Sequence, residues 1–345
     1  DSGSVAYSSP SNIALVKYWG KKANQIPANP SISFTLNNCK TLTTLKFEKK
    51  TTKGFSFEVF LDGIIQNEFK PKIKQFFERI EVYLPFLTSY HFKIETSNTF
   101  PHSSGIASSA SGMSALALCL VQLEQRLNLE MTKGFFNKKA SFLARLGSGS
   151  ACRSIEGTLI VWGSHTNIIG SSDLVGIKYP YKVHPCFNNF CDTILLVDKG
   201  EKQVSSTVGH DLMYRHPFAE QRFAQAHTNM DALIEVFKTG NLSAFISIVE
   251  REALTLHAMM MSSDPYFMLM KPNTLEIINK IWEFRKKTGL HICFTLDAGA
   301  NVHVLFPENE ANEIREFIKT SLVMHCQNEQ FIEDILGEGA QSIKI

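Results

Sequence analysis

The order in which strand and helix patterns follow one another constrains the fold of this chain more than any other feature of its sequence. In the first half, strand-like stretches at 41–48, 55–61 and 90–96 are rich in β-branched and aromatic residues. They precede apolar runs with helical spacing at 113–128 and 132–146. The first half therefore places its strands before its main helices.

The second half repeats this order. A strand pattern at 192–198 opens it, and the stretch 291–306 is typical of two strands around a tight Asp-Ala-Gly-Ala turn. The helical patterns of this half lie at 212–237, 242–259, 273–288 and 310–321. Because no regular βαβ alternation occurs, the pattern predicts an α+β fold with antiparallel sheets rather than a doubly wound parallel sheet.

Length and turn signals predict two domains. A chain of 345 residues exceeds the usual size of one domain. The turn-rich stretch "KYPYKVHP" at 178–185 is the best candidate boundary, so we expect an N-terminal domain over 1–184 and a C-terminal domain over 185–345.

Charge and cysteine content exclude several classes of protein. The formal net charge of +2 indicates no nucleic-acid partner, and no apolar run is long enough to span a bilayer. Residues 1–9 show no basic segment followed by an apolar one, so we expect no signal peptide. Seven cysteines, an odd number without a C-x-x-C pair, predict neither a disulfide framework nor a zinc site. Free thiols favour the cytoplasm.

The segment "PHSSGIASSASG" at 101–112 is a small-residue loop that opens a helix. Its free N–H groups, serine hydroxyls and positive helix end have the properties of a phosphate site. The segment is not a Walker A loop, since no G-x-x-x-x-G-K-[ST] occurs in the chain. A serine-capped helix start is the simpler alternative.

Three other stretches contain charged groups in unusual surroundings. Lys17 lies in the apolar run "SNIALVKYWGKK", where a lysine either extends to the surface or pairs with a buried acid. Asp297 follows the apolar run "ICFTL" and is either a turn former or a carboxylate directed into a cleft. In "LGSGSACRS", Arg153 offers a planar fork for a carboxylate or phosphate. Cys152 is best interpreted as a packed thiol, because the alternative, a nucleophile, would need a base partner such as histidine.

Together these stretches closely resemble one family. The blocks "NIALVKYWGKK", "NPSISFTL", "SSGIASSASG", "ARLGSGSACRSIEG" and "FTLDAGANVHVL" occur in the order found in mevalonate diphosphate decarboxylases, a branch of the GHMP kinase superfamily. The resemblance extends from about residue 5 to residue 310. It implies a ribosomal protein S5 domain 2-like N-terminal domain, a ferredoxin-like C-terminal domain and an active site in the cleft between them.

The resemblance also implies an activity. Mevalonate 5-diphosphate and ATP would be the substrates, and Mg²⁺ would accompany ATP. The 3-hydroxyl would be phosphorylated, and loss of phosphate and carbon dioxide would then give isopentenyl diphosphate. A homodimer is common in the family, although no feature of this sequence demonstrates one.

The family's functional residues map onto matching positions of this chain. The resemblance implies catalytic roles for Asp297, Lys17, Arg153 and Ser109. Arg153 would hold the substrate carboxylate, and the other substrate-binding positions would be Asn12, Tyr18, Lys21, Ser148, Gly149 and Ser150. The ATP phosphate loop would include Ser103, Ser104, Gly105, Ala107, Ser108 and Ser109. No side chain is predicted to bind a metal directly.

Other functions stay open at this point. A decarboxylase of the 5-monophosphate would need the same Asp297, Lys17 and Arg153. A mevalonate-type kinase would phosphorylate without decarboxylation, and a non-catalytic ligand-binding protein could share the fold. The chain also departs from the family pattern, because His210 stands where relatives carry a methionine and Ala300 where a proline is common.

Overall fold

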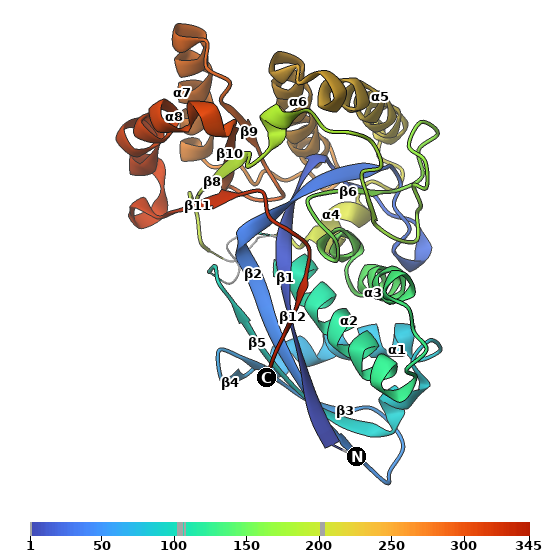
Figure 1. Cartoon of the computed structure of the whole chain (residues 1–345). Helices are drawn as coiled ribbons and strands as arrows, with labels where there is room; N and C mark the ends of the chain where they lie inside the picture. Colours follow the sequence, from blue (N-terminus) through green and yellow to red (C-terminus); the bar gives the residue numbers. More distant parts are fainter. Residues whose placement is uncertain (1, 102–105, 107, 201–203) are drawn as a thin grey trace.

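The computed structural model describes residues 2–101, 106, 108–200 and 204–345 (Figure 1). Among these residues, eight strands form one large sheet with the order β12-β1-β2-β5-β3-β4, and β6 and β7 extend it beside β2. The strands are β1 (Ser2–Val16), β2 (Ser31–Lys49), β3 (Ser56–Leu61), β4 (Ile64–Ile65), β5 (Tyr90–Asn98), β6 (Leu159–Trp162), β7 (Ile177–Lys178) and β12 (Gln341–Ile343).

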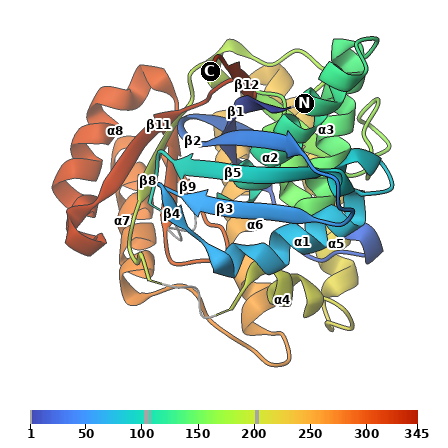
Figure 2. The ribbon, with the colours of Figure 1, turned by 90° about the horizontal axis from the view of Figure 1, so that it is seen from below.

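Helices α1 (Lys70–Ile80), α2 (Ser108–Leu127) and α3 (Lys133–Gly147) pack against this sheet. Figure 2 shows β2, β5 and β3 side by side with α2 behind them. Apolar residues of these strands and helices form one core, and Thr132 caps α3 by accepting a hydrogen bond from the backbone of Phe135 at 3.3 Å.

The second half contains a four-stranded antiparallel sheet with the order β11-β8-β10-β9. Its strands are β8 (Cys191–Leu195), β9 (Cys293–Thr295), β10 (Val302–Phe306) and β11 (Phe331–Ile335). Helices α7 (Pro272–Thr288) and α8 (Ala311–Phe317) cover one face. The other face packs into a core shared with β1, β2, β6, α5 (Ala219–Thr239) and α6 (Leu242–Met261). A short helix, α4 (Ser206–Asp211), precedes α5 in the chain.

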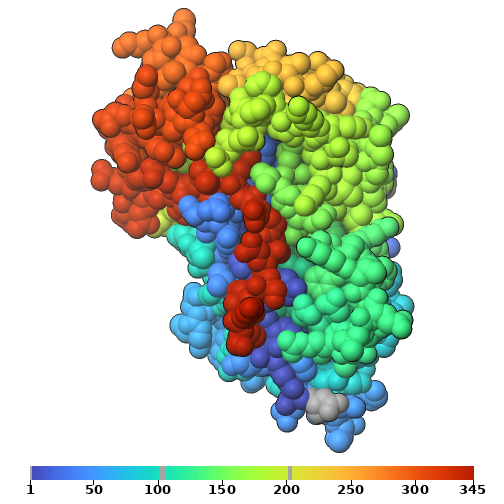
Figure 3. All heavy atoms as spheres, in the orientation of Figure 1, coloured from blue at the N-terminus to red at the C-terminus, as the bar shows by residue number. Residues whose placement is uncertain are grey.

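The two halves are joined through more than this shared core. Asp334 on β11 accepts hydrogen bonds from three backbone N–H groups of β2, those of Asn37, Asn38 and Cys39, at 2.8–3.0 Å. The chain then returns to the large sheet, where β12 pairs with β1 (Figure 3). The first and last segments of the chain therefore lie side by side.

The predicted α+β class is confirmed, and the neighbouring strands are antiparallel with one exception. The strand β3 runs parallel to β5 because α1 lies between them in the sequence and returns the chain to the same end of the sheet. The helix predicted at 310–321 is present, as α8 (Ala311–Phe317) followed directly by a π-helical turn over Ile318–Leu322. None of the described helices has the length and apolar character needed to cross a membrane.

Candidate active site

Lys17 and Asp297, 280 positions apart, form an ion pair. Lys17 directly follows β1 and Asp297 lies between β9 and β10. The Lys17 Nζ and Asp297 Oδ1 atoms are 3.1 Å apart, and the two side chains are 3% and 29% exposed. Burial lowers the pKa of Lys17, and the nearby Asp297 carboxylate opposes that shift. The carboxylate is thus the partner that a bound molecule can reach.

A second, fully buried ion pair fixes the backbone of Lys17. Glu252 of α6 accepts a hydrogen bond from the Lys17 N–H at 2.8 Å and two from Arg222 of α5 at 2.6 and 2.7 Å. Arg222 in turn donates to the Lys17 carbonyl oxygen at 2.9 Å. Both side chains of this pair are 0% exposed. The position of Lys17 therefore depends on two helices of the second half.

The same helix α6 also holds Asp297. His257 Nε2 lies 2.9 Å from the Asp297 carbonyl oxygen, which can only accept, so Nε2 carries the proton. Burial lowers the pKa of His257 to about 4, which keeps the ring neutral at neutral pH. The N–H of Gly299 donates to the same carbonyl at 2.8 Å. Both members of the ion pair are thus held by their backbones.

Arg153 lies buried near this pair. Its Nε donates to Asn12 Oδ1 at 3.2 Å, one Nη donates to Ser31 Oγ, and the guanidinium lies 5.8 Å from the centre of the Trp162 ring. Its positive charge contributes to the lowered pKa of Lys17. Asn12 is fixed in turn, because its Nδ2 donates to Ser154 Oγ at 2.7 Å. The fork of Arg153 is therefore oriented before any substrate binds.

Cys152, next to Arg153, is a buried thiol. Burial raises its pKa to about 12. A thiol that stays protonated at neutral pH is a poor nucleophile. The structure supports the interpretation of Cys152 as a packing residue.

Two serine segments meet at the start of α2. Ser109 Oγ and Ser148 Oγ are 3.5 Å apart. Gly149 lies under Tyr18 and Trp162, where an added Cβ would come within 2.9 Å of Tyr18 Oη and 2.7 Å of the indole, so a side chain there would clash. Ser108 and Ser150 lie at the ends of the same two segments. Four residues predicted for the phosphate loop lie outside the described part of the chain: Ser103, Ser104, Gly105 and Ala107.

A cavity of about 220 Å³ begins at this point. It lies between the large sheet, α1 and the first turns of α2, and combines apolar walls with a few polar groups. Its lining includes Val59, Leu61, Ile94 and Met113 together with Asn98, Lys72, Ser108 and Ser109. Apolar walls with few polar groups are typical of small-molecule sites.

Both halves of the chain match known family models. Residues 9–174 match the diphosphomevalonate decarboxylase-like N-terminal domain, and residues 193–343 match the mevalonate 5-diphosphate decarboxylase C-terminal domain. The diphosphomevalonate decarboxylase of Ganoderma lucidum is 30% identical over 331 residues, which cover 90% of this chain and 80% of the relative. The chain belongs to the diphosphomevalonate decarboxylase family.

Solved structures of this decarboxylase family have the same fold. A structure of MDDEF in complex with MVAPP, AMPPCP and magnesium has a TM-score of 0.85 and 29% identity, with 100% of both chains covered. The mevalonate diphosphate decarboxylase from Staphylococcus aureus has a TM-score of 0.84 and 26% identity, covering 100% of this chain and 99% of its own. The two-domain GHMP-type α+β fold is therefore confirmed.

His210, at the position where the sequence analysis expects a departure from the family pattern, packs against aromatic rings. The His210 ring lies 4.1 Å from the Tyr18 ring and 4.6 Å from the Trp19 ring, measured between centroids. Tyr18 also packs against Trp162, with ring centroids 4.6 Å apart. Lys21 is half-buried, and its charge acts on His210. Tyr18, Lys21 and His210 thus lie in one region.

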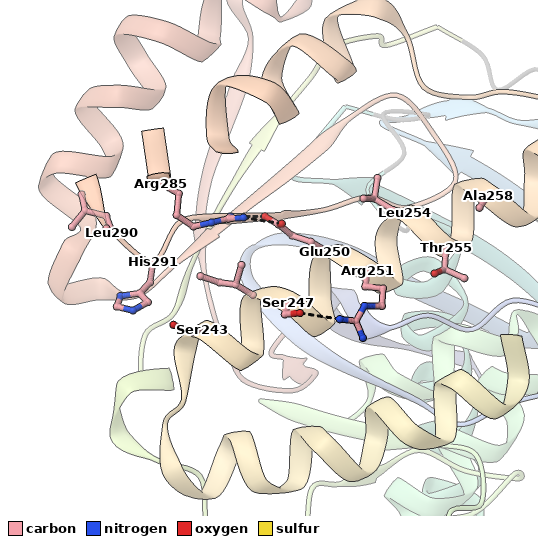
Figure 4. Close-up of a pocket in the computed structure, with 12 residues that line it drawn as sticks. Ser243, Ser247, Glu250, Arg251, Leu254, Thr255, Ala258, Arg285, Leu290 and His291 are labelled. Atoms are coloured by element: carbon pink, nitrogen blue, oxygen red, sulfur yellow. Dashed lines mark hydrogen bonds and ion pairs between the residues drawn. The ribbon is translucent and has the colours of Figure 1, made fainter. Parts of the chain in front are cut away.

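Sequence reasoning missed the residues that hold the ion pair from behind. Glu252, Arg222 and His257 lie on helices that also carry exposed charged residues, so residue type alone did not show which charges are buried. A larger cavity of about 730 Å³ lies over another face of α6 (Figure 4). Its described lining includes Glu250, Arg251 and Arg285 but neither member of the Lys17–Asp297 pair.

Proposed function

We propose that this decarboxylase-family chain converts mevalonate 5-diphosphate to isopentenyl diphosphate with the consumption of ATP, in isoprenoid biosynthesis by the mevalonate pathway. The observation that carries the proposal is the Lys17–Asp297 ion pair at 3.1 Å, in which the carboxylate is partly exposed and the amine is buried. The complex of the relative MDDEF with MVAPP, AMPPCP and magnesium supports the choice of substrates.

The side chains have complementary tasks in this reaction. Asp297 accepts the hydrogen bond of the 3-hydroxyl and orients its oxygen for phosphorylation. Lys17 stabilises the negative charge that builds up beside it during the transfer. Arg153 binds the substrate carboxylate with its fixed fork. The carbon–carbon bond to that carboxylate then breaks, and its electron pair forms the alkene as the phosphate leaves.

The described ends of the phosphate loop fit a nucleotide. Ser108 and Ser109 offer hydroxyl and N–H donors at the positive end of α2, and the adjoining cavity has apolar walls suited to a base. Bound ATP supplies the phosphoryl group, and Mg²⁺ neutralises the charge of its phosphates. Mg²⁺ would be held mainly by the phosphate oxygens of ATP and by water, in line with the expectation that no side chain binds the metal directly.

The donors assigned to the substrate tail favour a diphosphate. We place the tail against Tyr18, Lys21, Ser148 and Ser150, since more donors suit more negative charge. The 3.5 Å separation of Ser148 Oγ and Ser109 Oγ supports a tail that lies close to the nucleotide site.

A boundary at 184/185 between the two domains and a cytoplasmic location are part of the same proposal. Seven unpaired cysteines support the cytoplasmic location.

A parallel assay tests the proposed substrate. The purified chain is given Mg-ATP with either mevalonate 5-diphosphate or the 5-monophosphate, and release of ADP and carbon dioxide is measured. We expect kcat/KM for the diphosphate to be at least about tenfold higher, equivalent to about 1.4 kcal/mol. Equal or better turnover of the monophosphate would refute this choice. A stable 3-phosphorylated product without carbon dioxide would indicate a kinase instead.

A further inference from the structure

His210 is a buried side chain with one unused hydrogen-bonding atom. It lies on α4, is 9% exposed, and packs against the rings of Tyr18 and Trp19. Its Nδ1 lies 2.9 Å from the backbone nitrogen of Gly20. Because that N–H can only donate, Nδ1 accepts, and the proton of the neutral ring resides on Nε2.

Among the described residues the Nε2–H donates to no acceptor, yet Nε2 is not one of their fully enclosed, unsatisfied side-chain atoms, so this donor borders accessible space. Burial, together with the charges of Lys21 and Arg153, lowers the pKa of His210 to about 3. The ring therefore stays neutral at neutral pH and keeps this one donor. A donor that borders accessible space in this way is free to bond to water or to a ligand.

The surroundings of His210 identify the kind of acceptor that is missing. The cations that act on its ring are Lys21, with the larger effect, and Arg153. The adjacent Tyr18 also feels the carboxylate of Asp211, but more weakly than the charge of Arg153. Positive charge therefore dominates this region, and an anionic oxygen is the acceptor that suits it.

We propose that His210 is a substrate-binding residue whose Nε2–H donates a hydrogen bond to a phosphate oxygen of the substrate tail. This inference rests on the proposed function, because it requires a phosphorylated substrate in this part of the site. It gives the histidine a role that a thioether at the same position could not perform, since methionine sulfur has no proton to donate. His210 thereby adds a neutral, rigidly held donor to the charged group of Lys21.

Two substitutions separate hydrogen bonding from ring packing. His210→Met fills similar volume without a donor, and His210→Gln retains an N–H₂ donor. Hydrogen bonds to charged groups predict a rise in the substrate KM of about tenfold or more in His210→Met. We expect kcat and the KM for ATP to stay within about threefold of the parent, because neither the ion pair nor the nucleotide cavity is changed. His210→Gln should restore most of the affinity.

Inorganic pyrophosphate serves as a probe of the tail site alone. Its inhibition constant against the substrate should rise in His210→Met by a factor similar to that of the KM. His216 offers a matched control, since it is another buried histidine, 3.0 Å from the Met259 carbonyl oxygen. His216→Met should lower the thermal midpoint but leave the substrate KM and the pyrophosphate constant within about twofold.

Two results would overturn the role of His210. One is a substrate KM in His210→Met within twofold of the parent. The other is a KM that rises equally in the Met and Gln variants together with an equal fall in the thermal midpoint, which would assign the histidine to packing. The substrate preference of the parent protein is measured separately, so failure of the proposed diphosphate specificity is distinguishable from failure of this inference.

Discussion

Replacing Glu252 by glutamine removes one charge from a fully buried ion pair and leaves the other. Glu252 and Arg222 are both 0% exposed, and each Glu252 oxygen accepts a hydrogen bond from the guanidinium at 2.6–2.7 Å. Asn229 Nδ2 donates to the same carboxylate at 2.6 Å. In Glu252→Gln, the Arg222 charge stays in the interior without its counter-charge, and one amide N–H₂ group faces other donors.

The expected loss of stability is large. Breaking a buried ion pair by removing one partner destabilises a protein by about 3–5 kcal/mol. A shift of about 2–4 °C per kcal/mol holds for chains of about 150–250 residues and is smaller in longer ones, so the thermal midpoint should fall by about 6 °C or more and by less than about 20 °C. Thermal unfolding followed by circular dichroism measures this shift, and urea unfolding gives the free energy independently.

The same helix provides a matched control. Glu250 pairs with Arg285 at 2.6 Å, but these side chains are 10% and 25% exposed and border the large cavity (Figure 4). Water can solvate the charge that Glu250→Gln leaves behind, so we expect less than half the fall seen for Glu252→Gln. A Glu252→Gln midpoint within about 2 °C of the parent, or no lower than that of Glu250→Gln, would refute the reasoning.

A double substitution distinguishes stability from positioning. Glu252→Leu combined with Arg222→Met removes both charges, which is often neutral or stabilising in a buried pair. Stability should therefore recover relative to Glu252→Gln. Activity should not recover, because the Lys17 N–H loses its acceptor and the Lys17 carbonyl loses a donor. Recovery of both would show that Lys17 needs no support from these helices.

Two further predictions concern the catalytic pair and the pH dependence of stability. Asp297→Asn should lower kcat by about 10²–10⁴-fold with little change in the substrate KM, because the amide keeps the size of the carboxylate but not its charge. Steady-state release of ADP and carbon dioxide measures both constants. A near-parental kcat would exclude Asp297 from the mechanism. Burial lowers the pKa of His257 to about 4, against about 6.5 in an unfolded chain, so unfolding takes up a proton between these values. The free energy of unfolding should therefore fall as the pH decreases from about 6.5 toward 4, by up to about 1.4 kcal/mol per pH unit. His257→Gln should flatten this slope when urea unfolding is measured between about pH 7 and pH 5. Parallel slopes in the two proteins would contradict a neutral, buried His257.

The sequence allowed correct prediction of features that depend on local pattern. Alternation and helical spacing located most strands and helices, and the helical run predicted at 132–146 is α3 (Lys133–Gly147). Lys17 and Asp297 attracted attention because each is a charge at the end of an apolar run. The family resemblance implied a role for both in one site, and the structure places their charged atoms 3.1 Å apart.

Features that depend on tertiary packing could not be predicted in this way. Glu250, Arg251 and Glu252 are consecutive charged residues on α6, yet they are respectively nearly buried, exposed and fully buried. Helical spacing does not say which of them meets Arg222, because that depends on how α5 packs beside α6. The parallel β3–β5 pair was missed for a similar reason, since strand patterns carry no information on direction.

Helix α6 determines how closely Lys17 and Asp297 can lie. Glu252 and His257 are five residues apart, which corresponds to about 7.5 Å along the helix and about 140° around it. Glu252 therefore reaches the backbone of Lys17, and His257 reaches the backbone of Asp297, from different faces of one rigid element. The relative positions of the two main chains are thus set by helix geometry, and the side chains need little further ordering to make their contact. A site that is ordered in advance loses less entropy when the reacting groups align, which is the condition for efficient phosphoryl transfer to a weakly acidic tertiary alcohol.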